Sequence, residues 1–249
     1  MTDKTGTMLY LDGVSVSFDG FRAINKLSLI VHPAEMLAII GPNGAGKTTM
    51  MDIITGKTRP DDGEVLFDGR TDLTRLDEAA IANLGIGRKF QKPTVFESQT
   101  VWNNLEMALR KPRGIFQTLF YTASADDVAR IEDILQTVRL SARKDDLAAD
   151  LSHGQKQWLE IGMLLAQDPK LLLVDEPVAG MTDSETVETA KLLKSIAETR
   201  SVVVVEHDMS FVRDLGCRVT CLAEGSVLAE GTLDQVSANP VVIERYLGR

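Results

Sequence analysis

The stretch that decides the fold reads Gly41-Pro42-Asn43-Gly44-Ala45-Gly46-Lys47-Thr48. It fits the pattern G-x-x-x-x-G-K-[ST], in which glycines let the backbone turn tightly, so that successive N–H groups point inward at an anion. A short apolar strand precedes it, and a helix starting near Lys47 adds its positive dipole end. The stretch predicts a phosphate-binding loop. Lys47 would reach the outer phosphates, Thr48 would ligate Mg²⁺, and Thr49 completes the predicted nucleotide-binding set.

A second apolar strand, Leu171–Val174, is followed directly by Asp175 and Glu176. In a parallel sheet the carboxyl ends of the strands meet at one edge, so both carboxylates should lie beside the phosphate-binding loop. There Asp175 is placed to hold Mg²⁺, and Glu176 is placed to orient or deprotonate an attacking water. Read alone, Asp-Glu-Pro is equally compatible with a turn that merely ends the strand.

The rest of the chain alternates between strand and helix patterns. Period-two alternation fills the first ninety residues, and helical spacing follows, as in Val128, Ile131 and Leu135. Strand signals return after Pro169. We predict one α/β domain over residues 1–249 with a mixed, mainly parallel sheet and an N-terminal antiparallel β subdomain. Residues 1–91 and 169–249 would form the catalytic core, and residues 92–168 an inserted helical subdomain.

Composition excludes several classes of protein. The chain has 249 residues, 44% apolar and 25% charged, with a net charge of -9, which is opposite to that of a protein that tracks nucleic acid. No apolar run approaches the roughly 20 residues that span a bilayer, and no signal peptide is visible. Cys217 and Cys221 are predicted on one strand about 13 Å apart, too far for a disulfide. We expect a protein of the cytoplasm.

A third stretch identifies a family. Leu151-Ser152-His153-Gly154-Gln155 begins a predicted helix, with Ser152 as a natural N-cap. Together with the phosphate-binding loop and the acidic strand end, it resembles the signature of the ABC-type ATPases, P-loop NTPases whose usual Leu-Ser-Gly-Gly-Gln here carries His153. The resemblance covers nearly the whole chain. It implies ATP and Mg²⁺ as cofactors.

The resemblance also implies roles for single residues. Phe18 matches an aromatic that stacks on adenine; the alternative is that it simply belongs to the core. Gln91 matches the glutamine that contacts Mg²⁺ and the attacking water, and His207 matches a switch histidine at the γ-phosphate. The neighbouring cations Arg88, Lys89 and Lys92 are expected to be solvated surface.

In this family two ATPase domains meet head to tail, so that Ser152, His153, Gly154 and Gln155 would contact the ATP held by a second chain. Residues 87–105 and 178–183 resemble importers for branched-chain amino acids, amides and urea, most closely the urea-importer subunit. Thr182 stands where the wider family commonly has Asp. Thr182 and His153 both depart from the common family pattern, which is typical of a dimer whose two chains form different ATP sites. We therefore expect a heterodimer, with a homodimer as the alternative.

The implied partners are membrane-embedded permease subunits and, indirectly, a solute-binding protein, but no nucleic acid. The chain would act at the cytoplasmic face of the membrane. The rival interpretations are a soluble ABC-type ATPase without a permease, an ATPase of another ABC branch, and a GTPase. The GTPase is disfavoured because Asn25-Lys26 continues as Leu27-Ser28 and no Asn-Lys-x-Asp motif appears.

Overall fold

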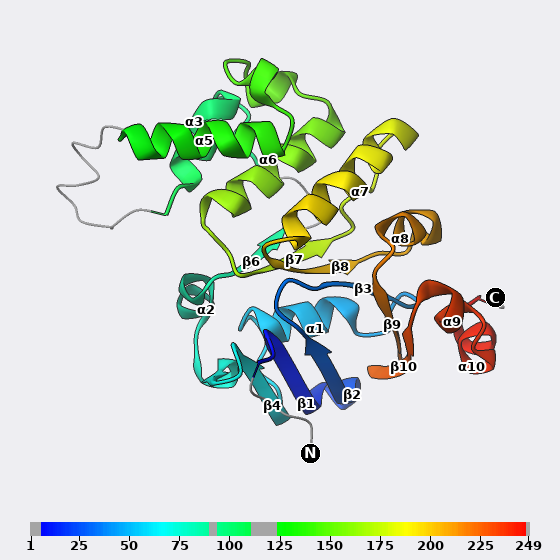
Figure 1. Ribbon diagram of the computed structural model, residues 1–249. Helices are drawn as coiled ribbons and strands as arrows, with labels where there is room; N and C mark the ends of the chain where they lie inside the picture. The colour runs from blue at the N-terminus through cyan, green and yellow to red at the C-terminus, as the bar shows by residue number, and fades with distance from the viewer. Residues whose placement is uncertain (1–5, 90–93, 111–123, 248–249) are drawn as a thin grey trace.

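The computed structural model describes residues 6–89, 94–110 and 124–247. Gln91 and Lys92 lie outside this part of the chain. Two sheets and a group of helices form its layers (Figure 1). No helix among the described residues combines the length and the apolar character needed to cross a membrane.

The smaller sheet is antiparallel, in the order β2-β1-β4-β5. Its strands are β1 (Leu9–Phe18), β2 (Phe21–Val31), β4 (Asp62–Phe67) and β5 (Thr71–Asp72). β1 and β2 are joined by Asp19 and Gly20, both at positive φ, which suits a two-residue hairpin turn. The predicted antiparallel β subdomain is therefore confirmed.

The larger sheet has the order β10-β9-β3-β8-β7-β6. All neighbouring strands from β9 to β6 are parallel, and β10 is antiparallel to β9. The strands are β3 (Met36–Ile40), β6 (Ile86–Lys89), β7 (Leu171–Asp175), β8 (Ser201–Val205), β9 (Arg218–Ala223) and β10 (Ser226–Gly231). This is the mixed, mainly parallel sheet that the sequence predicts.

Helices cover both faces of the larger sheet. The α-helices are α1 (Lys47–Ile54), α2 (Glu78–Leu84), α3 (Val101–Ala108), α5 (Ala125–Thr137), α6 (His153–Ala166), α7 (Asp183–Ala197), α8 (Met209–Leu215), α9 (Leu233–Ser237) and α10 (Pro240–Val242). Short turns of 3-10 helix span Leu73–Arg75, Ser141–Arg143 and Ala148–Asp150, and a π-helical turn spans Ile243–Leu247. α3, α5 and α6 fall within the predicted helical insert, whose boundaries stay a prediction.

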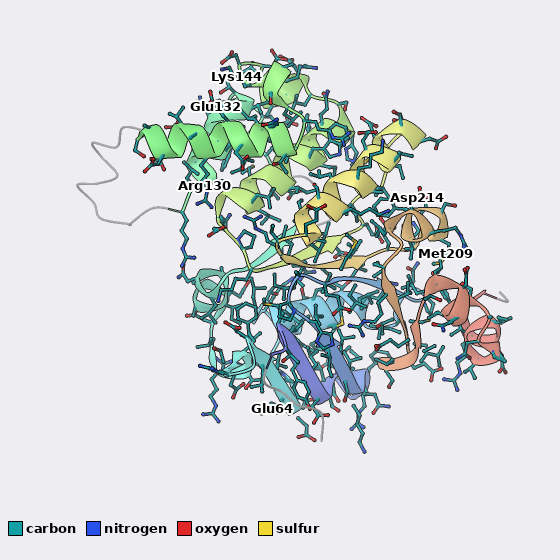
Figure 2. The ribbon with its side chains drawn as sticks, viewed as in Figure 1. Glu64, Arg130, Glu132, Lys144, Met209 and Asp214 are labelled. Atoms are coloured by element: carbon teal, nitrogen blue, oxygen red, sulfur yellow. The ribbon has the colours of Figure 1, made fainter. Side chains whose placement is uncertain are left out.

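Alternate residues of the central strands divide the core into two layers. Leu171, Leu173 and Val203 pack with α1 and the antiparallel sheet, whereas Leu172 and Val202 pack with the helices above. Figure 2 shows the resulting separation, with Lys144 and Glu132 on the helical group and Glu64 at the opposite end of the molecule. The central strands β3, β7 and β8 are apolar over most of their length because both of their faces are covered.

The two cysteines are separate thiols. Cys221 lies within β9 and is fully buried, and Cys217 directly precedes that strand. Burial raises the pKa of each thiol to about 11. The prediction that they do not pair is confirmed, although only Cys221 lies in the strand.

Candidate functional site

The phosphate-binding loop connects β3 to α1. α1 begins at Lys47, and its N-cap Gly46 has a φ of 97°. A Cβ atom on Gly46 would lie 2.7 Å from Ile24 Cδ1 and 2.8 Å from the carbonyl oxygen of Ala23. Only glycine fits this combination of left-handed backbone and close approach to β2. The loop is therefore held against the antiparallel sheet while the N-terminal end of α1 opens toward the cleft described below.

Lys47 is bound to its own loop. Its ammonium donates to the carbonyl oxygens of Gly41 at 2.5 Å and Pro42 at 3.0 Å, which uses two of its three donors. Burial lowers the pKa of Lys47, and the nearby carboxylates of Glu176 and Asp175 oppose that shift. The loop thus presents a cation directly opposite the two strand-end carboxylates.

A cleft of about 340 Å³ unites residues that are far apart in the sequence. Its volume is within the range typical of ligand sites. It is lined by Phe18, Phe21, Ala23, residues 43–49, Asp175, Glu176 and Val205. Most of the predicted nucleotide-binding and catalytic residues of this chain therefore meet in one place.

Asp175 and Glu176 lie at the carboxyl end of β7. Burial raises the pKa of Asp175, and the guanidinium of Arg88, 3.5 Å away, opposes the rise. Glu176 has a φ of 44°, and its N–H donates to the carbonyl oxygen of Val205 at 2.9 Å. This left-handed conformation turns the chain sharply after Asp175, so the two carboxylates are presented together to the cleft.

His207 lies beside Glu176. Its Nδ1 is 3.4 Å from Glu176 Oε1, and its side chain is 63% exposed. The backbone N–H groups of His207 and Asp208 both donate to Oε2 of Glu206, at 2.9 and 3.2 Å. Glu206 is almost fully buried, and burial raises its pKa. Sequence reasoning missed Glu206, which fixes the backbone that carries His207.

The expectation that Arg88 and Lys89 are solvated surface is wrong. The side chain of Arg88 is 5% exposed and donates to Asp52 on α1, at 2.5 Å. Lys89 is fully buried, with its ammonium 3.7 Å from Glu160 on α6. Consecutive residues of a strand point to opposite faces, and α1 and α6 cover the two faces of β6. Sequence reasoning missed that Arg88 and Lys89 belong to a strand whose two faces are both covered.

The aromatic end of the cleft contains two rings. Phe18 and Phe21 are directly opposite each other across the β1–β2 turn and are 48% and 68% exposed. The alternative that Phe18 belongs to the core is therefore wrong. Sequence reasoning missed Phe21, although the two-residue turn already places it across from Phe18. Together the rings offer a stacking surface beside the phosphate-binding loop.

Ser152 is the N-cap of α6, as predicted. Its hydroxyl accepts from the N–H of Gln155 at 3.2 Å and donates to Glu185 Oε1 at 2.9 Å. The other oxygen of Glu185 accepts from both the N–H and the hydroxyl of Thr182, the N-cap of α7, at 3.0 and 2.9 Å. Glu185 therefore joins the start of the signature helix to the loop that contains the variant Thr182.

The other signature residues pack against the same loop. His153 Nε2 lies 3.0 Å from the carbonyl oxygen of Ala179. A Cβ atom on Gly154 would lie 2.6 Å from the carboxyl carbon of Glu185, so a side chain there would displace that carboxylate. Residues 152–155 are not among those that line the cleft. In the described part of the chain, the signature stands apart from the phosphate-binding loop of its own subunit.

The cleft suits a magnesium nucleotide. Inward-facing N–H groups, the start of α1 and Lys47 match the charge of a triphosphate. The hydroxyl of Thr48 and the carboxylate of Asp175 are oxygen donors of the kind that Mg²⁺ prefers, and both residues line the cleft. Gln91, the third predicted metal contact, lies outside the described residues.

Known proteins share both the sequence and the fold. Residues 24–179 match the ABC transporter family. The chain is 33% identical to the high-affinity branched-chain amino acid transport ATP-binding protein LivG of Escherichia coli K12, covering 97% of this chain and 98% of that protein. A nucleotide-free ATP-binding cassette from an ABC transporter superposes with a TM-score of 0.84 at 28% identity, covering 98% and 100%. A dimeric cassette, MJ0796 bound to ADP and Pi, gives 0.75 at 27% identity, covering 91% and 99%.

Proposed function

The chain belongs to the ABC transporter family, and on that premise we propose that it is the ATP-hydrolysing subunit of an importer for branched-chain amino acids or a related small solute. It is an ABC-type ATPase, and its relatives work as ATP-binding subunits of transporters. The observation that carries the proposed site is the single cleft lined by Phe18, Lys47 and Glu176. The solute class rests on the relatives' function and on the resemblance of residues 87–105.

The polar and aromatic residues in and beside the cleft have proposed tasks. Phe18, with Phe21 beside it, stacks on the base, and Lys47 and the backbone N–H groups of residues 43–48 bind the phosphates. Glu176 accepts the proton of the attacking water, with His207 3.4 Å away to bind the released charge. When bound, Mg²⁺ would be held by Thr48 and Asp175, with Gln91 as a further ligand, and would neutralise charge on the outer phosphates.

The second half of the ATP site would come from a partner chain. Residues 152–155 lie away from this chain's own cleft lining, which supports their use on the nucleotide of a second subunit. We propose a heterodimer, because His153 and Thr182 both depart from the common family pattern. Thr182 carries no charge, but the carboxylate of Glu185 lies 3.0 Å from its N–H and supplies a negative charge at the same loop.

A heterodimer is tested by mixing this chain with a candidate second ATPase chain of the same family. Alone, the chain should bind Mg-ATP, dimerise weakly and hydrolyse ATP slowly, and turnover should rise on mixing. Sedimentation velocity and steady-state phosphate release measure both properties. Full cooperative hydrolysis by this chain alone, with no gain on mixing, would favour a homodimer instead.

The transport function is tested with the complete transporter in proteoliposomes. ATP inside the vesicles, together with the solute-binding protein outside, should drive uptake of labelled leucine or isoleucine. A urea importer is the second candidate, favoured by the resemblance of residues 178–183, and labelled urea is therefore measured in parallel. ATP hydrolysis without any association with membrane-embedded subunits would instead indicate a soluble ABC-type ATPase.

A further inference from the structure

We propose that Glu160 is a positioning residue for ATP hydrolysis, because its carboxylate ties α6, the helix that begins at the signature, to β6 and thereby to the catalytic strand ends. The inference rests on the proposed function, in which the signature and the strand-end carboxylates act on ATP. It assigns a role to the buried ion pair between Lys89 and Glu160, neither of which lines the cleft. Glu160 acts through other residues and is not placed against ATP.

The two oxygens of Glu160 bind different segments of the chain. Oε1 accepts from the hydroxyl of Thr94 at 2.8 Å, and Oε2 lies 3.7 Å from the ammonium of Lys89. Lys89 ends β6, and Thr94 begins the described segment that leads into α3. In the sequence these anchors stand on either side of Gln91. One carboxylate on α6 thus holds the chain both before and after that residue.

The pair is buried deeply enough to be rigid. Lys89 is fully buried and Glu160 is 4% exposed. Among the described residues no hydrogen bond satisfies Oε2, so the Lys89 cation compensates it. Breaking one partner of a buried pair leaves an uncompensated charge, which strongly disfavours alternative arrangements. The carboxylate therefore fixes α6 relative to β6 instead of adapting to small displacements.

Lys89 also lies within the electrostatic field of the catalytic edge. The carboxylates of Asp175 and Glu206, at the ends of β7 and β8, both act on its charge, in addition to Glu160. Glu206 in turn holds the backbone of His207. A displacement of α6 would move Lys89 and so change the electrostatic environment of Asp175 and Glu206. Its effect would therefore reach the strand ends beside the cleft as well as the signature.

Helix geometry gives the length of this connection. Glu160 lies eight residues after Ser152, about 12 Å along α6 at 1.5 Å per residue. A helix of 14 residues moves as a unit over that distance. Engagement of Ser152 by a partner chain would thus be transmitted to Lys89 and Thr94 without any change within α6.

The test compares variants of the assembled transporter by steady-state ATP hydrolysis, nucleotide binding and thermal unfolding. Glu160→Gln keeps the shape and an acceptor for Thr94 but removes the charge that faces Lys89. We expect kcat to fall about tenfold or more, with KM for Mg-ATP changed less than twofold because the phosphate-binding loop is untouched. Thr94→Val removes the second anchor and should lower kcat about threefold.

Two further variants separate positioning from simple stability. The double variant Lys89→Met with Glu160→Met replaces the ion pair by apolar side chains and should restore the melting temperature while kcat stays low. Thr189→Val is the control for Thr94→Val, because the hydroxyl of Thr189 also binds a side chain of α6: it accepts from Trp158 at 2.9 Å, although Thr189 is fully buried and Thr94 is exposed. It should leave kcat unchanged.

The outcomes distinguish the inference from the function on which it rests. If the assembled wild type does not hydrolyse ATP, or if hydrolysis is unaffected in Glu176→Gln, the proposed function fails. If hydrolysis requires Glu176 but Glu160→Gln and Thr94→Val both keep wild-type kcat, the inference alone is overturned. Recovery of kcat together with the melting temperature in the double variant would also overturn it, because the pair would then be only structural.

Discussion

Replacing Arg88 by methionine should lower the free energy of unfolding far more than the same substitution at an exposed arginine. The guanidinium is 5% exposed and contacts two carboxylates, those of Asp52 and Asp175. Removing one partner of a buried ion pair costs about 3–5 kcal/mol. Lys57 remains 3.6 Å from Asp52, and both carboxylates keep some access to water, so we expect the lower end, about 3 kcal/mol.

For a chain of this length, about 3 kcal/mol corresponds to a fall of roughly 6–12 °C in melting temperature. Differential scanning calorimetry of the wild type and Arg88→Met measures it. Arg213→Met is the matched control, because Arg213 makes an ion pair of similar length with Asp234, at 2.8 Å, but both side chains are largely exposed. In the Arg213→Met control the free energy of unfolding should fall by less than about 1 kcal/mol.

The loss of stability in Arg88→Met should also depend on pH. Burial raises the pKa of Asp175 and Arg88 opposes the rise, so the variant should raise that pKa further. The folded state then binds a proton more tightly than the unfolded state, and the destabilisation shrinks as the pH falls from about 7 to about 5. A melting temperature within about 2 °C of the wild type at neutral pH, or equal losses in both arginine variants, would refute the buried-pair reasoning.

Four further predictions concern the cleft and the thiols. Glu176→Gln should preserve ATP binding but slow hydrolysis about 10²–10⁴-fold, the usual effect of a general base, and wild-type turnover would remove it from the mechanism. Lys47→Ala should weaken Mg-ATP binding about tenfold or more in a fluorescence titration, since a charge-assisted bond of roughly 1.5–3 kcal/mol is lost; unchanged affinity would contradict the phosphate-binding assignment. Phe18→Ala should weaken ATP and GTP binding by similar factors, because stacking reads a ring face; unaltered affinity for both would exclude stacking. Cys217 and Cys221, with pKa values raised to about 11, should react with a chromogenic disulfide at about pH 8 at least about a hundredfold more slowly in the native than in the unfolded protein. Rapid native labelling would show that the thiols are accessible.

Local patterns in the sequence predicted most of the fold and much of the cleft. Residues 41–48 and Asp175 could be placed because each lies at the end of a recognisable buried strand. The roles of Arg88 and Glu160 could not be predicted, because they depend on contacts across 36 and 66 residues of chain. Charged residues in a short segment are predicted to be exposed to solvent unless it is known that helices cover both faces of the strand.

The position of Arg88 and Lys89 on β6 also has a consequence for aggregation. β6 is the last strand of its sheet and is four residues long, so its outer backbone is a potential template for another chain. A chain pairing there would have to pack against a strand whose inward side chains are charged and already bound to α1 and α6. The ion pairs that organise the interior therefore also protect the edge. Variants that neutralise them should form intermolecular β-structure more readily on refolding at high concentration.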